Sequence, residues 1–172
     1  MNLQSNDFEI FGLAPAFALD RAQLDERWKA LQREAHPDRH VAADARTQRQ
    51  AMQWSVRINE AYQRLKDPIR RAAYLCELHG VPVDAERNTH MPPAFLMQQL
   101  QWREALEEAS SLDALEDMAD DVAGARARMI EQARCLADEQ HDFGGLAGQV
   151  RALMFVERFS RDIEKRIDQL GQ

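Results

Sequence analysis

Three adjacent residues, His36, Pro37 and Asp38, carry side chains that suit several kinds of chemistry. The imidazole and the carboxylate can bind a metal ion together with His40, act as a hydrolytic His–Asp pair, or cap a neighbouring backbone group. They can also be presented to another protein. Proline disfavours helical geometry in the residue before it, so a preceding helix should end near Ala35 or His36. The three residues are therefore expected in an exposed turn between two helices.

Two of these chemistries find little support in the rest of the sequence. Pro37 prevents a regular helix from placing His36 and His40 on one face, which weakens the metal hypothesis. No Ser or Cys lies in the strand-to-helix elbow typical of a hydrolytic nucleophile, and the remaining histidines are scattered without ligand spacing. A capping role and a docking role for the tripeptide both stay open at this point.

The segments on either side of the tripeptide have the pattern of amphipathic helices. Apolar residues recur at helical spacing from Leu24 to Ala35, and Asp20 with Gln23 forms a capping-box pattern at the start of that segment. A second apolar stripe runs through residues 44–66. Two such stripes joined by a short loop predict an antiparallel pair of helices.

Shorter helical segments are expected to flank this pair. Residues 7–13 should form an opening turn that packs its aromatic side chains. Asp67 and Pro68 suit the N-cap and the first position of another helix, and Gly80 is a natural C-terminal stop. The sequence thus predicts a first domain over residues 1–79.

The second half of the chain is predicted to be a separate helical module. Residues 80–93 hold three prolines and no clear periodicity, which predicts a linker or a loop wedged between modules. Phe143-Gly144-Gly145 is expected to break the last two helices, and the short connections favour a three-helix bundle over residues 94–172. Alternating strand patterns are absent, so the predicted fold class is all-α. The three helical segments are expected at about 94–109, 112–140 and 146–170.

Composition and charge restrict the classes of partner. The 172 residues carry a net charge of −7, and residues 81–172 account for it with 10 Lys and Arg against 18 Asp and Glu. In residues 1–80 the corresponding numbers are 12 and 11. A net acidic chain without a basic aromatic stripe makes nucleic acid an improbable partner, and the uneven charge suggests two modules with different partners.

The sequence also predicts the compartment. No apolar run approaches the roughly 18 residues that span a membrane, and the N-terminal segment has neither the basic nor the apolar region of a signal peptide. Cys76 and Cys135 lie far apart within helical patterns. We therefore expect a cytoplasmic protein with two reduced thiols, no membrane contact and no cofactor or bound metal.

The first helix of the second module has more apolar surface than a bundle needs. Phe95 and Trp102 fall on what should be its core face, whereas Leu96, Met97 and Leu100 lie progressively around the cylinder. Three apolar residues on a second face suggest a docking surface. The alternative is that a broad core, or contact with the first module, covers them.

The last helix has a similar pattern. Val156, Phe159, Ile163 and Ile167 form its core stripe. Phe155 should then lie at the edge of that stripe, available to a neighbour.

The order of features in the first half resembles a J-domain. J-domains dock on 70-kDa-class heat-shock chaperones and stimulate their ATPase, and the resemblance implies that His36, Pro37 and Asp38 form the trigger. The matching runs are FEIFGL at 8–13, LDERWKAL at 24–31, HPD at 36–38, INEAY at 58–62 and LKDP at 65–68.

By the same resemblance, basic residues beside the trigger steer the contact with the chaperone. Lys29 and Arg33 lie one turn apart, opposite the apolar face, although Glu26 and Glu34 nearby also fit a merely solvated surface. Arg39 departs from the family, which commonly has lysine after the tripeptide. The charge is retained there, but the hydrogen-bonding geometry differs.

A J-domain followed by an acidic three-helix bundle resembles the HscB family of bacterial type. Those co-chaperones deliver an IscU-type iron–sulfur scaffold protein to a dedicated HscA-type chaperone. Met97 and Leu100 with Leu96 match the family's apolar scaffold contacts, Glu104 matches an acidic one, and Phe155 matches an aromatic one. At Gln101 the bacterial pattern often has an acid, so an electrostatic contact is lost or moved.

The expected function is therefore that of an adaptor that is not itself an enzyme. One module presents the trigger to the chaperone and the other holds the scaffold protein. Two rivals remain: a J-domain protein with a different client, and a His/Asp metal-dependent hydrolase. The sequence offers no phosphate-binding glycine loop and no cluster ligands for activity of its own.

Overall fold

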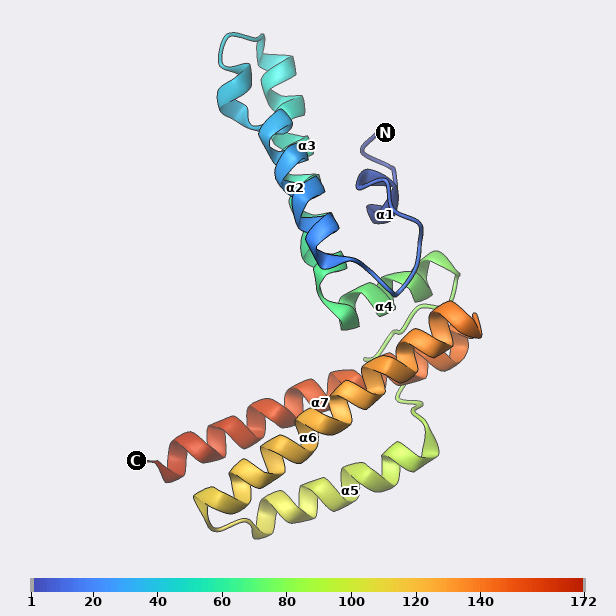
Figure 1. The fold of residues 1–172 in the computed structure, drawn as a ribbon, viewed down its shortest axis with the longest axis vertical. Coiled ribbons are helices and arrows are strands. Elements are labelled where there is room, and N and C mark those ends of the chain that lie inside the picture. Colours follow the sequence, from blue (N-terminus) through green and yellow to red (C-terminus); the bar gives the residue numbers. More distant parts are fainter. Residues whose placement is uncertain (1, 172) are drawn as a thin grey trace. The chain divides into compact units, whose positions relative to one another are not determined.

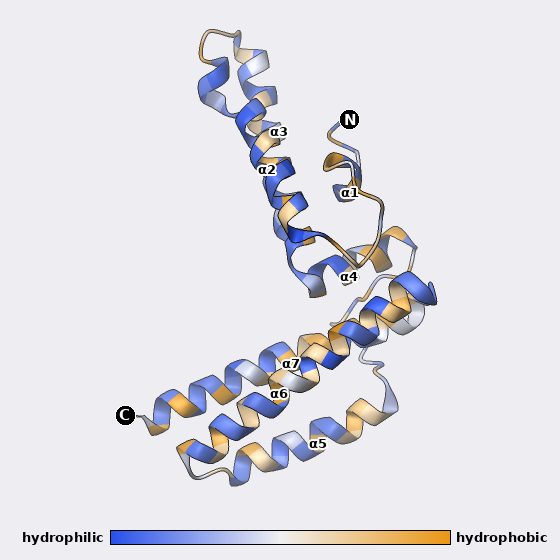
Figure 2. Cartoon of the chain, in the orientation of Figure 1, coloured by the Kyte–Doolittle hydropathy of each residue, from blue (hydrophilic) through white to orange (hydrophobic). Residues whose placement is uncertain are grey.

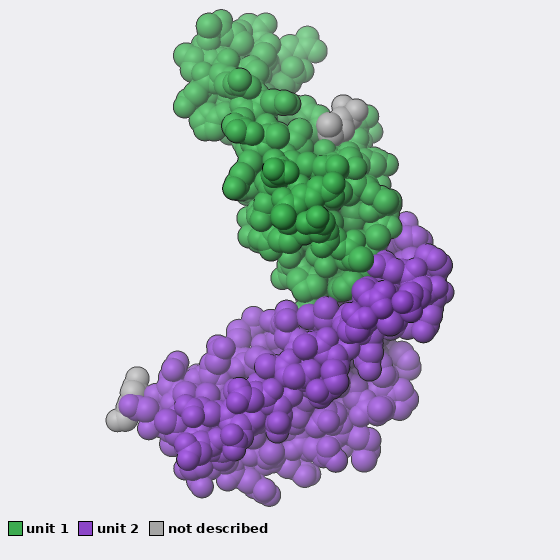
Figure 3. Space-filling view, viewed as in Figure 1, with its two compact units in different colours: residues 1–74 green, residues 75–172 purple. Residues whose placement is uncertain are grey.

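Helices form all the regular secondary structure in residues 2–171, the part of the chain that the computed structural model describes. This confirms the predicted all-α fold class. Within that part, none of the helices is both long enough and apolar enough to cross a membrane. The chain divides into two compact units, residues 1–74 and residues 75–172 (Figure 3). The terminal residues 1 and 172, which belong to the predicted domain ranges, lie outside the described residues.

The first unit is built on an antiparallel pair of helices, α2 and α3, as predicted (Figure 1). Asp20 caps α2 by accepting a hydrogen bond from the Gln23 backbone N–H, and Asp44 caps α3 in the same way through Thr47. Its helical elements are α1 (Asp7–Ile10), α2 (Arg21–Ala35), the 3₁₀ turn η1 (Pro37–His40), α3 (Ala45–Lys66) and the beginning of α4 (Pro68–Leu78).

Apolar side chains of α2 and α3 pack together between the first half of α2 and the last turns of α3. Leu24 and Leu65 are completely buried, and the rings of Trp28 and Tyr62 stack with their centroids 4.3 Å apart. The Tyr62 hydroxyl donates to Asp25, whose carboxylate also pairs with the guanidinium of Arg21. The Arg21 hydrogen bond, followed by that of Tyr62, lowers the pKa of the Asp25 carboxyl.

A buried ion cluster joins α1 to the rest of the first unit. The Asp7 carboxylate has no exposed surface, and its two oxygens lie 2.8 Å from Arg57 and 3.1 Å from Arg64. The Asp7 backbone N–H donates to the hydroxyl of Tyr74, on α4. Burial raises the pKa of Tyr74, so this hydroxyl stays protonated at neutral pH. The cluster holds α1 against the second half of α3 and against α4.

The second unit contains three long helices that lie side by side (Figure 1). Its core is formed by the apolar stripe of α7, where Leu146, Val150, Leu153 and Val156 are nearly inaccessible to solvent. The alternation of apolar and polar residues along α6 and α7 is visible in Figure 2. The elements are α5 (Pro93–Glu108), α6 (Leu112–Arg134) with a following π-helical turn (Cys135–Glu139), and α7 (Phe143–Leu170).

Residues 79–92 connect α4 to α5 and are held by specific contacts within the second unit. The buried guanidinium of Arg151 donates to the carbonyl oxygens of Val83 and His90, at 2.8 and 3.0 Å. The His79 ring stacks on Phe143 with a centroid distance of 3.6 Å. These contacts explain why the division between the units falls within α4. The ranges 1–79, 80–93 and 94–172 stay predictions for the domains.

The break before α7 differs from the prediction. Gly144 and Gly145 do not interrupt the helices but belong to the first turn of α7, and the interruption lies at residues 140–142. The cause is Asp142, whose side chain accepts a hydrogen bond of 2.8 Å from the Gly145 N–H. A Cβ at Gly145 would lie only 2.5 Å from Asp142 Oδ2, so glycine is what allows this cap to close.

We predict that Gly145→Ala destabilises the second unit by about 0.5–2 kcal/mol, because the added methyl group displaces the capping carboxylate of Asp142. Gly144→Ala is the matched control, since a Cβ there would lie at an ordinary 3.7 Å from the same side chain. It should be neutral or stabilising by up to about 1 kcal/mol. Urea unfolding of both variants measures the difference, and equal midpoints would contradict this account of the cap.

Candidate functional site

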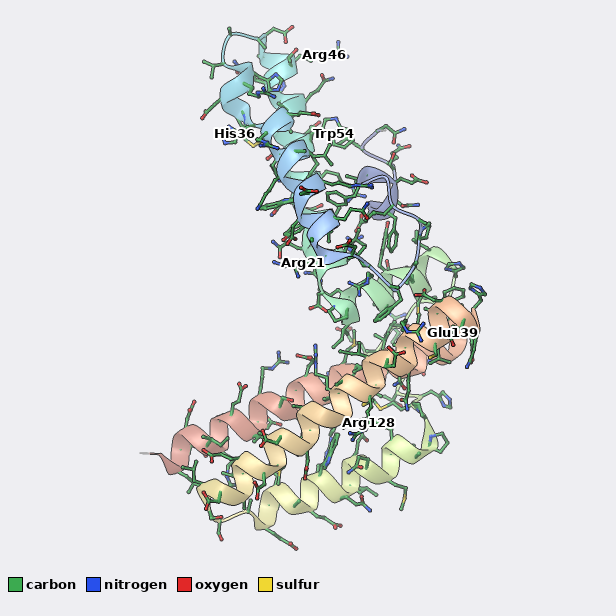
Figure 4. All side chains as sticks on the ribbon, in the orientation of Figure 1. Arg21, His36, Arg46, Trp54, Arg128 and Glu139 are labelled. Atoms are coloured by element: carbon green, nitrogen blue, oxygen red, sulfur yellow. The ribbon has the colours of Figure 1, made fainter. Side chains whose placement is uncertain are left out.

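The His36-Pro37-Asp38 turn lies at the loop end of the α2–α3 pair, where Figure 4 places His36 at the opposite end of α2 from Arg21. His36 ends α2 in an extended conformation, with φ −60° and ψ 132°, as expected for a residue before proline. Its Nδ1 accepts a hydrogen bond of 3.2 Å from the Asp38 backbone N–H. The side chains of His36 and Asp38 are 57% and 87% exposed.

This geometry makes the capping role of His36 compatible with docking. Because Nδ1 acts as the acceptor, the neutral ring carries its proton on Nε2. Within residues 2–171 no group accepts a hydrogen bond from that Nε2. The turn therefore offers one outward N–H donor and one exposed carboxylate, two residues apart, to a partner.

His40 does not join His36 at a common site. Its Nε2 lies 3.1 Å from the carbonyl oxygen of Glu34, so the ring is bound back to α2. Among the described residues, no group of three or more His, Cys, Asp or Glu side chains is arranged to hold a metal ion.

Two of the predicted steering residues lie directly beside the trigger. Arg33, His36 and Arg39 line one shallow hollow of about 360 Å³, together with Gln32. Lys29 lies one helical turn before Arg33, and all three basic side chains are exposed. In residues 2–171 none of them forms an ion pair. The structure thus brings the predicted trigger and basic side chains that form no ion pair to one surface of the described residues.

The apolar residues of α5 divide between two faces, as expected from their spacing. Phe95 and Trp102 are each 8% exposed, whereas Leu96, Met97 and Leu100 are 45%, 63% and 60% exposed. Gln101 and Glu104 are also exposed on this helix. Within the described part of the second unit, neither a broad core nor another element covers the three aliphatic side chains. We call Leu96, Met97 and Leu100 the α5 stripe.

Aromatic contacts explain why α5 turns this side outward. The Phe95 ring packs edge-on against Trp102 and Phe155, with centroid distances of 6.0 and 5.7 Å. Trp102 and Phe155 each stack on Phe159, at 5.6 and 5.8 Å. Four rings thus hold one face of α5 against α7, and the α5 stripe is left on another side of the helix.

The predicted accessibility of Phe155 was wrong. Its ring is only 6% exposed, because it packs between Phe95 and Phe159 and because Arg103 covers it from α5. The guanidinium carbon of Arg103 lies 5.2 Å from the centroid of the Phe155 ring. A partner on this surface meets Arg103 before it meets Phe155.

Arg103 lies in the stretch that resembles the family's scaffold-binding helix, but sequence reasoning gave it no role of its own. Helical spacing alone could have indicated it, because Arg103 follows Leu100 by three residues and so lies on the same side of α5. Its aromatic partner comes from α7, however, and no local pattern pairs the two residues.

Comparisons with known proteins agree on one family. Residues 91–164 match the family model described as the HSCB C-terminal oligomerisation domain. The chain is 48% identical over 167 residues to the co-chaperone protein HscB homolog of Ralstonia nicotianae, which covers 95% of this chain and 94% of that protein.

Solved structures extend the likeness to the whole fold. The chaperone HscB from Vibrio cholerae superposes with a TM-score of 0.80 at 36% identity, covering 96% of this chain and 99% of that one. The crystal structure of human co-chaperone protein HscB gives a TM-score of 0.80 at 26% identity, covering 99% of this chain and 84% of the human one. These matches agree with the predicted arrangement of an N-terminal J-domain and a C-terminal helical bundle.

Proposed function

Because the chain belongs to the HscB family of co-chaperones, we propose that it carries an IscU-type iron–sulfur scaffold protein to an HscA-type heat-shock chaperone and stimulates the ATPase of that chaperone. The chaperone hydrolyses the ATP, whereas this chain binds the scaffold protein and positions it at the chaperone. Its bacterial relatives and its two free cysteines, Cys76 and Cys135, support a cytoplasmic location.

The chaperone contact is assigned to the exposed turn and its basic neighbours. His36 presents a ring N–H, Asp38 presents a carboxylate, and Pro37 holds the two in a fixed 3₁₀ turn. Lys29, Arg33 and Arg39 surround the turn with positive charge, which suits an acidic surface on the chaperone. Long-range attraction of this kind raises the association rate more than the final affinity.

The scaffold contact is assigned to the α5 stripe with Gln101, Glu104 and Phe155. An exposed group of three aliphatic side chains on one helix provides the apolar centre that protein interfaces use. Glu104 and the neutral Gln101 belong to its polar rim. Phe155 supports this surface from below, through Arg103, rather than forming its exposed part.

The observation that carries the proposal is the separation of the two residue sets. The trigger lies in residues 1–74 and the α5 stripe lies in residues 75–172, so both partners can bind without sharing a single contact residue. A chain that binds both raises the effective concentration of the scaffold at the chaperone. This explains how stimulation of the ATPase can be coupled to the presence of the client.

We predict that His36→Gln lowers stimulation of the HscA-type ATPase about tenfold or more, a size typical of coupling between sites. The ring is exposed, so thermal stability and scaffold binding should stay unchanged. His90→Gln is the control, because His90 is an exposed histidine in the other unit. Steady-state ATPase assays measure the effect, and full stimulation by His36→Gln would show that the trigger lies elsewhere.

For the combined variant Leu96→Ala, Met97→Ala and Leu100→Ala we expect scaffold binding at least about tenfold weaker, because central apolar contacts dominate interface energies. Stimulation of the chaperone without scaffold should be retained. The control is Leu112→Ala with Leu170→Ala, which removes exposed leucines elsewhere on the same unit.

Isothermal titration with the purified scaffold protein measures both variants. Unchanged affinity in the triple variant would contradict the assignment of the α5 stripe. A loss of stability of about 3 kcal/mol or more would mean that the three side chains belong to the core. If the wild-type chain does not bind the scaffold, the J-domain serves a different client.

A further inference from the structure

We propose that the pocket between α5 and α7 above Phe155 receives acidic side chains of the scaffold protein, held by Arg103, Arg158 and Arg161. This inference rests on the proposed function and adds a second, electrostatic contact to the α5 stripe. We call this site the arginine pocket. It holds about 390 Å³ and is lined by Arg103, Leu106, Glu107, Phe155, Arg158, Phe159, Arg161 and Asp162.

The positive charge of the pocket is not neutralised by ion pairs. In residues 2–171 none of the three guanidinium groups has a carboxylate oxygen within 4.0 Å. Two other arginines of this unit are paired, Arg126 with Glu157 and Arg134 with Glu131, whereas Arg128 outside the pocket also lacks an ion pair in residues 2–171. What distinguishes the pocket is that it gathers three such guanidinium groups around one hollow, where an anion can meet them together.

Glu107 and Asp162 also line the pocket and are exposed. Three cations against two carboxylates leave the pocket net positive, within a sequence whose second half is strongly acidic. The general field of residues 81–172 attracts a basic partner, whereas this pocket accepts an acidic group. A positive pocket on a negatively charged surface fixes the register of an interface. It also disfavours partners that have no acidic side chain at the corresponding position.

Arg103 lies over the ring of Phe155, with 5.2 Å between its guanidinium carbon and the ring centroid, which is a cation–π contact. In residues 2–171 no carboxylate pairs with the N–H donors of this guanidinium. Those donors are available for a two-point contact with a carboxylate, which is the geometry that arginine favours.

The arginine pocket continues the α5 stripe. Leu96, Leu100, Arg103 and Glu107 follow one another at spacings of four, three and four residues, so they lie along one side of α5. A scaffold segment that covers Leu96 and Leu100 therefore reaches Arg103 within one further helical turn. The same segment can place apolar residues on the α5 stripe and an acidic residue in the pocket.

Gln101 lies two residues before Arg103 and hence on a different side of α5. The electrostatic contact expected at position 101 in the bacterial pattern thus has no direct replacement in the arginine pocket. The arginine pocket is therefore a separate contact on another side of α5, directed at an acidic group of the scaffold.

The test uses the full-length chain with Arg158→Glu and Arg161→Glu combined. Both side chains are exposed, so the fold should be preserved, and circular dichroism melting checks this. The matched control, Arg128→Glu with Lys165→Glu, makes the same charge change on exposed residues outside the pocket. Binding to the IscU-type scaffold is measured for wild type, variant and control across a salt series.

We expect the pocket variant to bind the scaffold about tenfold more weakly than the control, mainly through slower association and with a smaller salt dependence. Equal affinities of variant and control would overturn the arginine pocket while leaving the proposed function intact. A change in self-association of the variant, seen by size-exclusion chromatography without altered scaffold affinity, would overturn it in favour of a second copy as the occupant. Failure of the wild-type chain to bind scaffold would overturn both proposals.

Discussion

The ring contacts of Phe95 and Trp102 with Phe155 and Phe159 determine what the second unit offers to a partner. An amphipathic helix buries one face, and in α5 the aromatic rings determine that the buried face is the one that packs against α7. With these rings packed against α7, the α5 stripe lies on a side of α5 that is exposed to solvent. Its residues are nevertheless as apolar as many in the core. The exposed stripe is therefore a consequence of the aromatic packing.

The first unit follows the same logic with different residues. Leu24 and Leu65 bury the facing sides of α2 and α3, so Lys29 and Arg33 turn outward. The buried carboxylate of Asp7, paired with Arg57 and Arg64, ties α1 to this pair at a distance from the trigger. A buried ion pair of this kind contributes little net stability but makes loss of one partner costly. It favours one arrangement of α1 over others.

Most of the fold could be predicted because its signals are local. Helical spacing from Leu24 to Ala35 and the caps at Asp20 and Asp67 fix where helices begin and which face they bury. Gly144 and Gly145 misled the prediction because glycine usually interrupts helices, and only the capping geometry of Asp142 shows why they open one. Phe155 misled it for another reason: its cover, Arg103, comes from a helix distant in sequence.

The candidate sites also differ in whether local sequence signals or contacts between distant helices form them. Exposure of His36 and Asp38 follows from one proline, and exposure of Leu96, Met97 and Leu100 follows from their helical spacing, so both were accessible to sequence reasoning. The arginine pocket was not, because it joins residues of α5 and α7 that no periodic pattern relates. Binding itself, at either surface, stays a prediction.

The central claim is that one chain couples a client to a chaperone, and the ATPase rate of the HscA-type chaperone tests it most directly. The rate is measured with this chain alone, with the scaffold alone, and with both together. Our account predicts that the stimulation with both present exceeds the sum of the two separate effects, because the chain brings the scaffold to the chaperone. A purely additive rate would contradict it.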